Sequence, residues 1–163
     1  MGLRALRERL NPTDDRPSIP RRDVEFQGRT WVTRPHPYVD RLACAWLIHR
    51  FVDPRGKVRY RDRPRASEVA FDMSGGDYQH VGPLCTFEGM LQTFGLGAPG
   101  LRAIADIVHE IDLRDGLAPR PETAGVEAIL AGWLQSGMDD HALGEAGIAL
   151  FDGLRRRFST PGE

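Results

Sequence analysis

Apolar residues recur at helical spacing along several stretches of this chain. Between positions 38 and 51 the side chains of Val39, Leu42 and Trp46 fall on one helical face. Pro54 then favours a stop. The same spacing predicts further helices over residues 86–94, 99–112, 125–135 and 141–158.

Short extended stretches lie before and after the first predicted helix. Residues 30–33 are β-branched or aromatic, which favours a strand. Residues 57–63 alternate with period two, and this places four basic side chains on one strand face: Lys57, Arg59, Arg61 and Arg63. Residues 69–73 and 78–81 are further extended pieces, joined by a turn at 74–77. The pattern predicts an α+β fold, mainly helical, with a small sheet of short strands.

All predicted elements lie between residues 30 and 158, which indicates a single domain over that range. Apolar residues make up 40% of the chain, enough to fill one core. Residues 1–29 contain several arginines and prolines but few large apolar side chains after Leu10, so we expect a basic, poorly ordered leader. Residues 159–163 form a short tail.

Net charge and cysteine usage narrow the functional classes. The formal net charge of -1 gives no overall attraction to nucleic acid or anionic membranes. No apolar run reaches about 18 residues, and the charged N-terminus does not resemble a signal peptide, so a cytoplasmic protein without membrane partners is expected. Cys44 and Cys85 form no CxxC pair and are expected to be reduced thiols in that compartment.

Four polar residues suggest a metal site. His109 and Asp112 are three positions apart on one predicted helix, and His80 and Glu88 flank a short link that lets them face a common point. Two imidazoles and two carboxylates suit a divalent transition metal, namely zinc, manganese, iron or nickel. Each residue also has a structural interpretation: a local hydrogen bond, a core histidine, or a charge at a helix N-terminus.

The first helix offers a carboxylate and a thiol one turn apart, Asp40 and Cys44, with Arg41 beside them. A thiolate at Cys44 would bind a soft metal or reduce an oxidant. The alternative is that Asp40 caps the first turn while Cys44 packs as a small hydrophobic side chain. Cys85 precedes a predicted helix start, where the helix dipole would lower its pKa.

The basic stripe of residues 57–63 fits either an anion or solvent. Its guanidinium groups suit chromate, phosphate or a nucleic-acid backbone. The alternative is the charged, solvated face of an edge strand. The sequence contains no GxxxxGK[ST], HExxH or GxSxG motif, which argues against the commonest P-loop, zincin and hydrolase sites.

Several blocks of the sequence resemble the chromate-resistance domain found at the C-terminus of ChrB-type regulators. The first block runs from Trp31 to Pro54 and contains the string Val-Asp-Arg-Leu-Ala-Cys-Ala-Trp-Leu-Ile. Matching segments around Asp72, Glu88 and Asp112 follow in the expected order. Ala45 departs from the proline that is usual after the cysteine. The resemblance covers about residues 30–158 and implies a role in the bacterial response to chromate.

From this resemblance we expect a non-catalytic binding or sensing domain. The expected metal ligands are His80, Glu88, His109 and Asp112, with Asp40 in or near the ligand set. Arg34 and Arg41 would supply positive charge for chromate or a similar oxyanion.

Three further possibilities stay open. The same cluster would serve a small metal-dependent or thiol-dependent enzyme, a reductase or a hydrolase. The basic stripe would serve a nucleic-acid-binding accessory, although direct promoter binding is not expected because only a short leader precedes the match. A homodimer formed through the last helix is the third.

Overall fold

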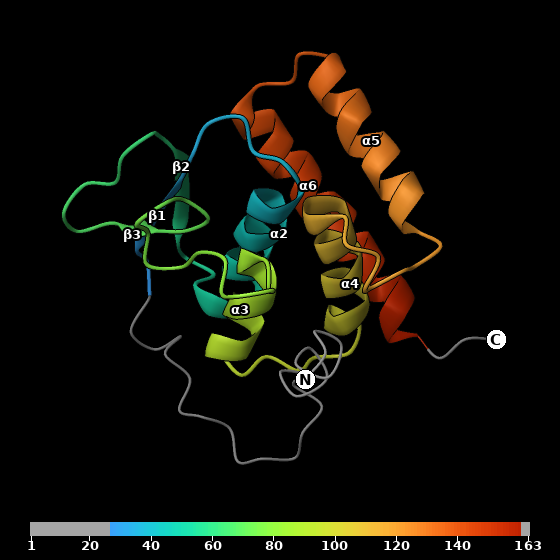
Figure 1. Cartoon of the computed structure of the whole chain (residues 1–163). Coiled ribbons are helices and arrows are strands. Elements are labelled where there is room, and N and C mark those ends of the chain that lie inside the picture. The colour runs from blue at the N-terminus through green and yellow to red at the C-terminus, as the bar shows by residue number, and fades with distance from the viewer. Residues whose placement is uncertain (1–26, 161–163) are drawn as a thin grey trace.

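A small parallel sheet stands beside a group of helices in the computed structural model, which describes residues 27–160 (Figure 1). Strands β1 (Thr30–Thr33), β2 (Lys57–Tyr60) and β3 (Val69–Ala70) are arranged in the order β2-β1-β3. Both neighbours of β1 run parallel to it. The prediction of an α+β fold with a small sheet of short strands is confirmed. Most of the predicted leader lies outside the described residues.

Within residues 27–160, six helical segments follow the order expected from the apolar spacing. Helix α2 (Val39–Leu47) continues directly into a π-helical turn, η2 (Ile48–Val52). The others are α3 (Thr86–Thr93), α4 (Leu101–Leu113), α5 (Thr123–Gln135) and α6 (Asp140–Ser159). No helix in residues 27–160 is long and apolar enough to cross a membrane.

Helix α2 is the centre of the core and contacts α3, α4 and α6 (Figure 1). Every residue of α2 except Arg41 is buried. Trp46 is fully buried, and its indole Nε1 donates a 2.8 Å hydrogen bond to Asp152 on α6. Arg50 forms a bidentate ion pair with the same carboxylate. Because α2 is buried on nearly all sides, its polar side chains lie in surroundings of low dielectric constant. Each of them therefore requires a hydrogen-bond or ion-pair partner.

Two strands are shorter than predicted. The predicted strand 57–63 ends at Tyr60, although the backbone N–H of Arg61 still donates a 2.8 Å hydrogen bond to the Thr33 carbonyl. The Arg61 side chain forms an ion pair with Glu68. The predicted strand 69–73 ends after Ala70, although Phe71 still forms a single bridge with Tyr78. The chain turns at Asp72, whose φ of 47° lies in the left-handed region and is incompatible with a continuing strand.

Candidate functional site

Three aspartates surround the imidazole of His80. Asp40 lies in the first turn of α2, Asp112 near the end of α4, Asp72 just after β3, and His80 in the segment before α3. The Nε2 atom of His80 lies 3.1 Å from Asp112 Oδ2, 3.3 Å from Asp40 Oδ2 and 3.8 Å from Asp72 Oδ1. We call Asp40, Asp72, His80 and Asp112 the open cluster, because the His80 side chain is 44% exposed.

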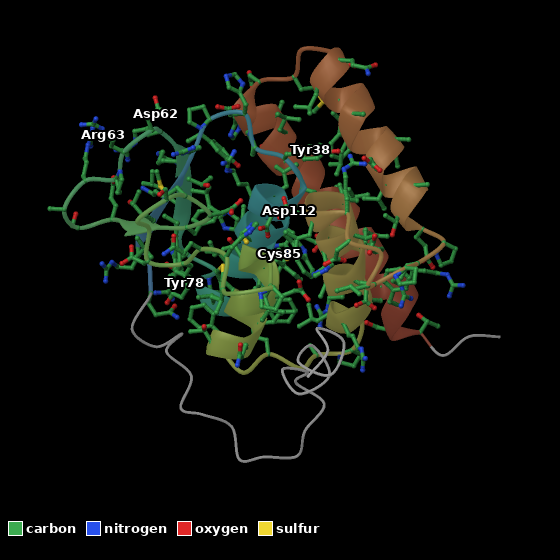
Figure 2. All side chains as sticks on the ribbon, in the orientation of Figure 1. Tyr38, Asp62, Arg63, Tyr78, Cys85 and Asp112 are labelled. Carbon is green, nitrogen blue, oxygen red and sulfur yellow. The ribbon has the colours of Figure 1, made fainter. Side chains whose placement is uncertain are left out.

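The open cluster forms where α2, α3 and α4 meet. Figure 2 labels Asp112 and Cys85, whose side chains lie in this central region. Asp40 is buried, and its carboxylate accepts 2.9 Å hydrogen bonds from the backbone N–H groups of Thr86 and Phe87. Asp40 therefore caps the N-terminus of α3. The alternative prediction, that Asp40 caps the first turn of its own helix, named the wrong helix. The two hydrogen bonds position the carboxylate beside His80.

Asp72 is tied to the same corner. Its Oδ1 accepts a 2.9 Å hydrogen bond from the hydroxyl of Thr86. The Nε atom of Arg41 lies 3.6 Å from Asp72 Oδ2 and donates a 3.3 Å hydrogen bond to the Asp72 carbonyl. One arginine thus partly offsets the negative charge of the open cluster.

The crowding of carboxylates shifts several protonation equilibria. The hydrogen-bonded contact with Asp40 raises the pKa of His80 to about 9, against the opposing effect of partial burial, and the charges of Asp112 and Asp72 add to the rise. Burial and the charge of Asp40 raise the pKa of Asp72 to about 6. The same two causes raise the pKa of Asp112. A histidine that stays protonated at neutral pH indicates surplus negative charge at this point.

The geometry of the open cluster fits a divalent metal. One ligand atom each from Asp40, His80 and Asp112 lies within 4.8 Å of the others. Ligands at about 2.1 Å from a common ion are separated by comparable distances. The buried Oδ2 atom of Asp112 makes no hydrogen bond within the described part of the chain, although it lies near His80. A nitrogen and two or three carboxylates are a donor set for manganese, iron, zinc or nickel.

Glu88 and His109 belong to a second group of polar residues. His109 is fully buried on α4; its Nδ1 contacts Glu88, and its Nε2 lies 2.8 Å from Asp115 Oδ2. Glu88 also accepts a 3.3 Å hydrogen bond from the backbone of Cys85, completing a capping box at the start of α3. We call Glu88, His109 and Asp115 the closed cluster.

The five predicted metal ligands therefore do not surround a single point. Asp40, His80 and Asp112 come together, whereas Glu88 and His109 pair with each other and with Asp115. Although His109 and Asp112 are three positions apart on α4, they have different partners.

Both cysteines are buried and unbridged. Cys44 Sγ lies 3.6 Å from Asp40 Oδ1. Burial, together with the nearby charges of Asp40 and Asp72, raises the pKa of Cys44 well above its ordinary value. Burial and the charge of Asp40 also raise the pKa of Cys85, so the expected helix-dipole effect does not dominate there. The environment favours thiols that pack over thiolates that react.

The predicted arginines have different surroundings. Arg41 is half-buried beside Asp72, whereas Arg34 is exposed just after β1. In the basic stripe, Lys57 and Arg59 are exposed on β2, which is an edge strand. These surroundings resemble the solvated edge described above.

Sequence reasoning missed Asp72 as a site residue. The position of Asp72 shortly after β3 was the signal that could have indicated it. Strand β3 runs parallel to β1, and polar residues at the carboxyl ends of parallel strands often face a ligand site. It also missed a cleft of about 830 Å³ that begins at His80 and Thr86.

Comparisons with known proteins agree with the resemblance seen in the sequence. The family model described as "ChrB, C-terminal domain" matches residues 31–158. Protein ChrB of Cupriavidus metallidurans is 41% identical over 150 residues, which cover 88% of this chain and 45% of that protein. The chain thus spans about half the length of this curated relative. No solved structure matches. The chain belongs to the ChrB C-terminal domain family, a family associated with chromate resistance.

Proposed function

We propose that this domain binds one divalent metal ion through Asp40, His80 and Asp112, and that the bound metal receives chromate or a similar oxyanion. The observation that carries the proposal is the convergence of three aspartates on one ring nitrogen of His80. A single imidazolium cannot balance three carboxylates, and their mutual repulsion is relieved by a divalent cation.

Charge balance supports a metal as the element that recruits an oxyanion. Three ionised aspartates repel a chromate dianion, so the metal-free cluster is a poor anion site. A divalent cation together with Arg41 offsets the three negative charges. A bound metal would supply positive charge for an oxyanion, and Arg41 would offer that oxyanion a further hydrogen bond.

The capping of α3 by Asp40 provides a route from binding to a conformational response. The same carboxylate that faces His80 accepts the hydrogen bonds of Thr86 and Phe87. A shift of Asp40 toward a metal weakens the cap and favours a different position of the α3 N-terminus. In this proposal the bound ligand shifts the equilibrium between two positions of the α3 N-terminus, and that shift is the sensing event.

Elemental analysis of the purified protein tests the proposal. We expect about one equivalent of a transition metal in the wild-type protein and none in a His80→Ala/Asp112→Ala double variant. His141→Ala removes an exposed histidine on α6 and is the matched control. Equal metal content in the wild type and the double variant contradicts the proposal.

The cleft beside His80 favours a second candidate, a metal-dependent hydrolase. A metal held by three protein ligands keeps positions for water, and such water is a nucleophile near neutral pH. Turnover of an ester substrate by the metal-loaded protein, lost in His80→Ala, would favour this enzyme over the sensor. The thiol-dependent reductase has less support, because Cys44 is buried with a raised pKa.

A further inference from the structure

The cleft next to the open cluster extends far beyond the proposed metal. Its volume is about 830 Å³, and its wall includes His80 and Thr86 at one end and Thr93 at the other. Thr86 and Thr93 are the first and last residues of α3. At about 1.5 Å of rise per residue, the cleft follows the helix for about 10 Å.

This length exceeds what an inorganic oxyanion needs. Chromate and phosphate are single tetrahedra, whereas cavities of about 300–1,000 Å³ hold organic molecules of drug size. The cleft has an apolar side formed by Tyr78, Val81 and Met90. Val81 is 56% exposed, the largest exposed fraction among the large apolar side chains described. An apolar group lying in the cleft would cover it.

The charged side chains that line the cleft away from His80 all have protein partners. The guanidinium of Arg29 donates a 3.1 Å hydrogen bond to the Ser67 carbonyl. Glu68 binds Arg61 and the backbone of Arg65, and Asp77 accepts a 2.8 Å hydrogen bond from the backbone of Ala70. Away from the metal the cleft therefore suits an uncharged organic group with hydrogen-bonding atoms. Gln79 and Thr93 offer polar side chains to such a group.

We infer that the ligand of this site is an organic phosphate: a phosphate monoester whose tetrahedral head reaches the metal and whose organic group lies along α3. The inference rests on the proposed metal site. The phosphate head presents the same tetrahedral dianion as chromate, so chromate occupies only the metal end. The cleft then distinguishes the organic ligand from inorganic anions through contacts that the inorganic anions cannot make.

Calorimetric titration of the full chain tests this inference. The protein is titrated first with Mn²⁺, and the loaded protein is then titrated with inorganic phosphate and separately with adenosine monophosphate. Thr93→Trp fills the far end of the cleft without touching the open cluster. Gln92→Trp is the matched control, since Gln92 is exposed on the same turn and does not line the cleft. Val81→Ser is a milder second variant that removes apolar surface.

We expect adenosine monophosphate to bind at least tenfold more tightly than inorganic phosphate. Thr93→Trp should remove that advantage and leave Mn²⁺ and phosphate binding unchanged, Gln92→Trp should preserve it, and Val81→Ser should reduce it severalfold. Equal affinity for the two phosphates, or an advantage that survives both cleft variants, overturns the inference while leaving the metal site intact. Failure of the first titration, with no Mn²⁺ bound, overturns the proposed function and this inference with it.

Discussion

The open and closed clusters use the same residue types in opposite ways. In the closed cluster His109 is fully buried, and each of its ring nitrogens faces one carboxylate, Glu88 or Asp115. In the open cluster His80 is 44% exposed, and a single ring nitrogen faces three carboxylates. The closed cluster is internally satisfied, whereas the open cluster has more acceptors than protons to share.

This difference distinguishes a structural group from a ligand site. Buried polar groups that are fully paired stabilise one arrangement of the chain and have no atoms left for a ligand. Surplus carboxylates at a partly exposed position keep atoms available, and their repulsion is relieved when a cation binds. The comparison leads to five predictions.

The largest expected effect is on metal affinity. His80→Ala removes the nitrogen ligand of the open cluster, so Mn²⁺ or Zn²⁺ should bind at least about a hundredfold more weakly. His109→Ala should change that affinity by less than about threefold, because His109 faces Glu88 and Asp115. Competition with a fluorescent chelator measures both variants. Similar losses in both would show that the two clusters act as one site.

The second effect is on the free energy of unfolding. Here His109→Ala should have the larger effect and His80→Ala the smaller one. His109→Ala leaves a cavity in the core and removes one hydrogen-bond partner each from Glu88 and Asp115, which should cost about 3 kcal/mol of unfolding free energy. His80→Ala should cost the metal-free protein less than His109→Ala does, because His80 is half-exposed and water screens its ion pairs. Urea unfolding of the metal-free proteins compares them. A larger loss in His80→Ala would reverse the assignment of the two clusters.

The third effect is a pH dependence of the open cluster. The folded-state pKa of His80, about 9, exceeds the ordinary value of 6.5, so its stabilisation is present below about pH 6.5 and is lost as the pH rises through 9. The raised pKa of Asp72, about 6, has the same sign between about pH 4 and 6. The metal-free protein should therefore become less stable with rising pH.

Metal binding should show the opposite trend. His80 must lose its proton to become a ligand, so affinity should rise between pH 6 and 9, with about one proton released per metal at pH 7. Calorimetry in buffers of different ionisation enthalpy measures this proton. Binding without proton release would indicate that His80 is not a ligand.

The smallest effect concerns Cys44. Burial and the raised pKa of this thiol predict no reaction with a thiol reagent while the protein is folded, and full reaction once it is unfolded. Cys44→Ala should cost about 1 kcal/mol of stability and leave metal affinity unchanged. Fast labelling of Cys44 in the native protein would instead support the redox hypothesis.

Much of the fold was predictable because the apolar spacing is strong. The residues that begin and end α3, α4 and α6 lie within two positions of those predicted. The strand ends were less predictable, since the left-handed φ at Asp72 and the pairing of Arg61 with Glu68 depend on tertiary surroundings.

The site was predictable in composition but not in arrangement. The sequence indicated Asp40, His80 and Asp112, but spacing alone also grouped His109 with them. A separation of three positions places His109 and Asp112 on the same side of α4. Small differences in side-chain direction nevertheless bring them to different partners. Which partner each one finds depends on how α3 packs against α4, a contact that sequence spacing does not contain.

The contact between α2 and α6 has a consequence for synthesis of the chain on the ribosome. Trp46 packs beneath α6 and hydrogen-bonds Asp152, more than a hundred residues further along. Synthesis adds about 5–20 residues per second, so the apolar surface of α2 stays uncovered for about 5–20 s until α6 has been made. The nascent domain therefore exposes this apolar surface during that interval, and a chain terminated before α6 should be recovered mainly as aggregate.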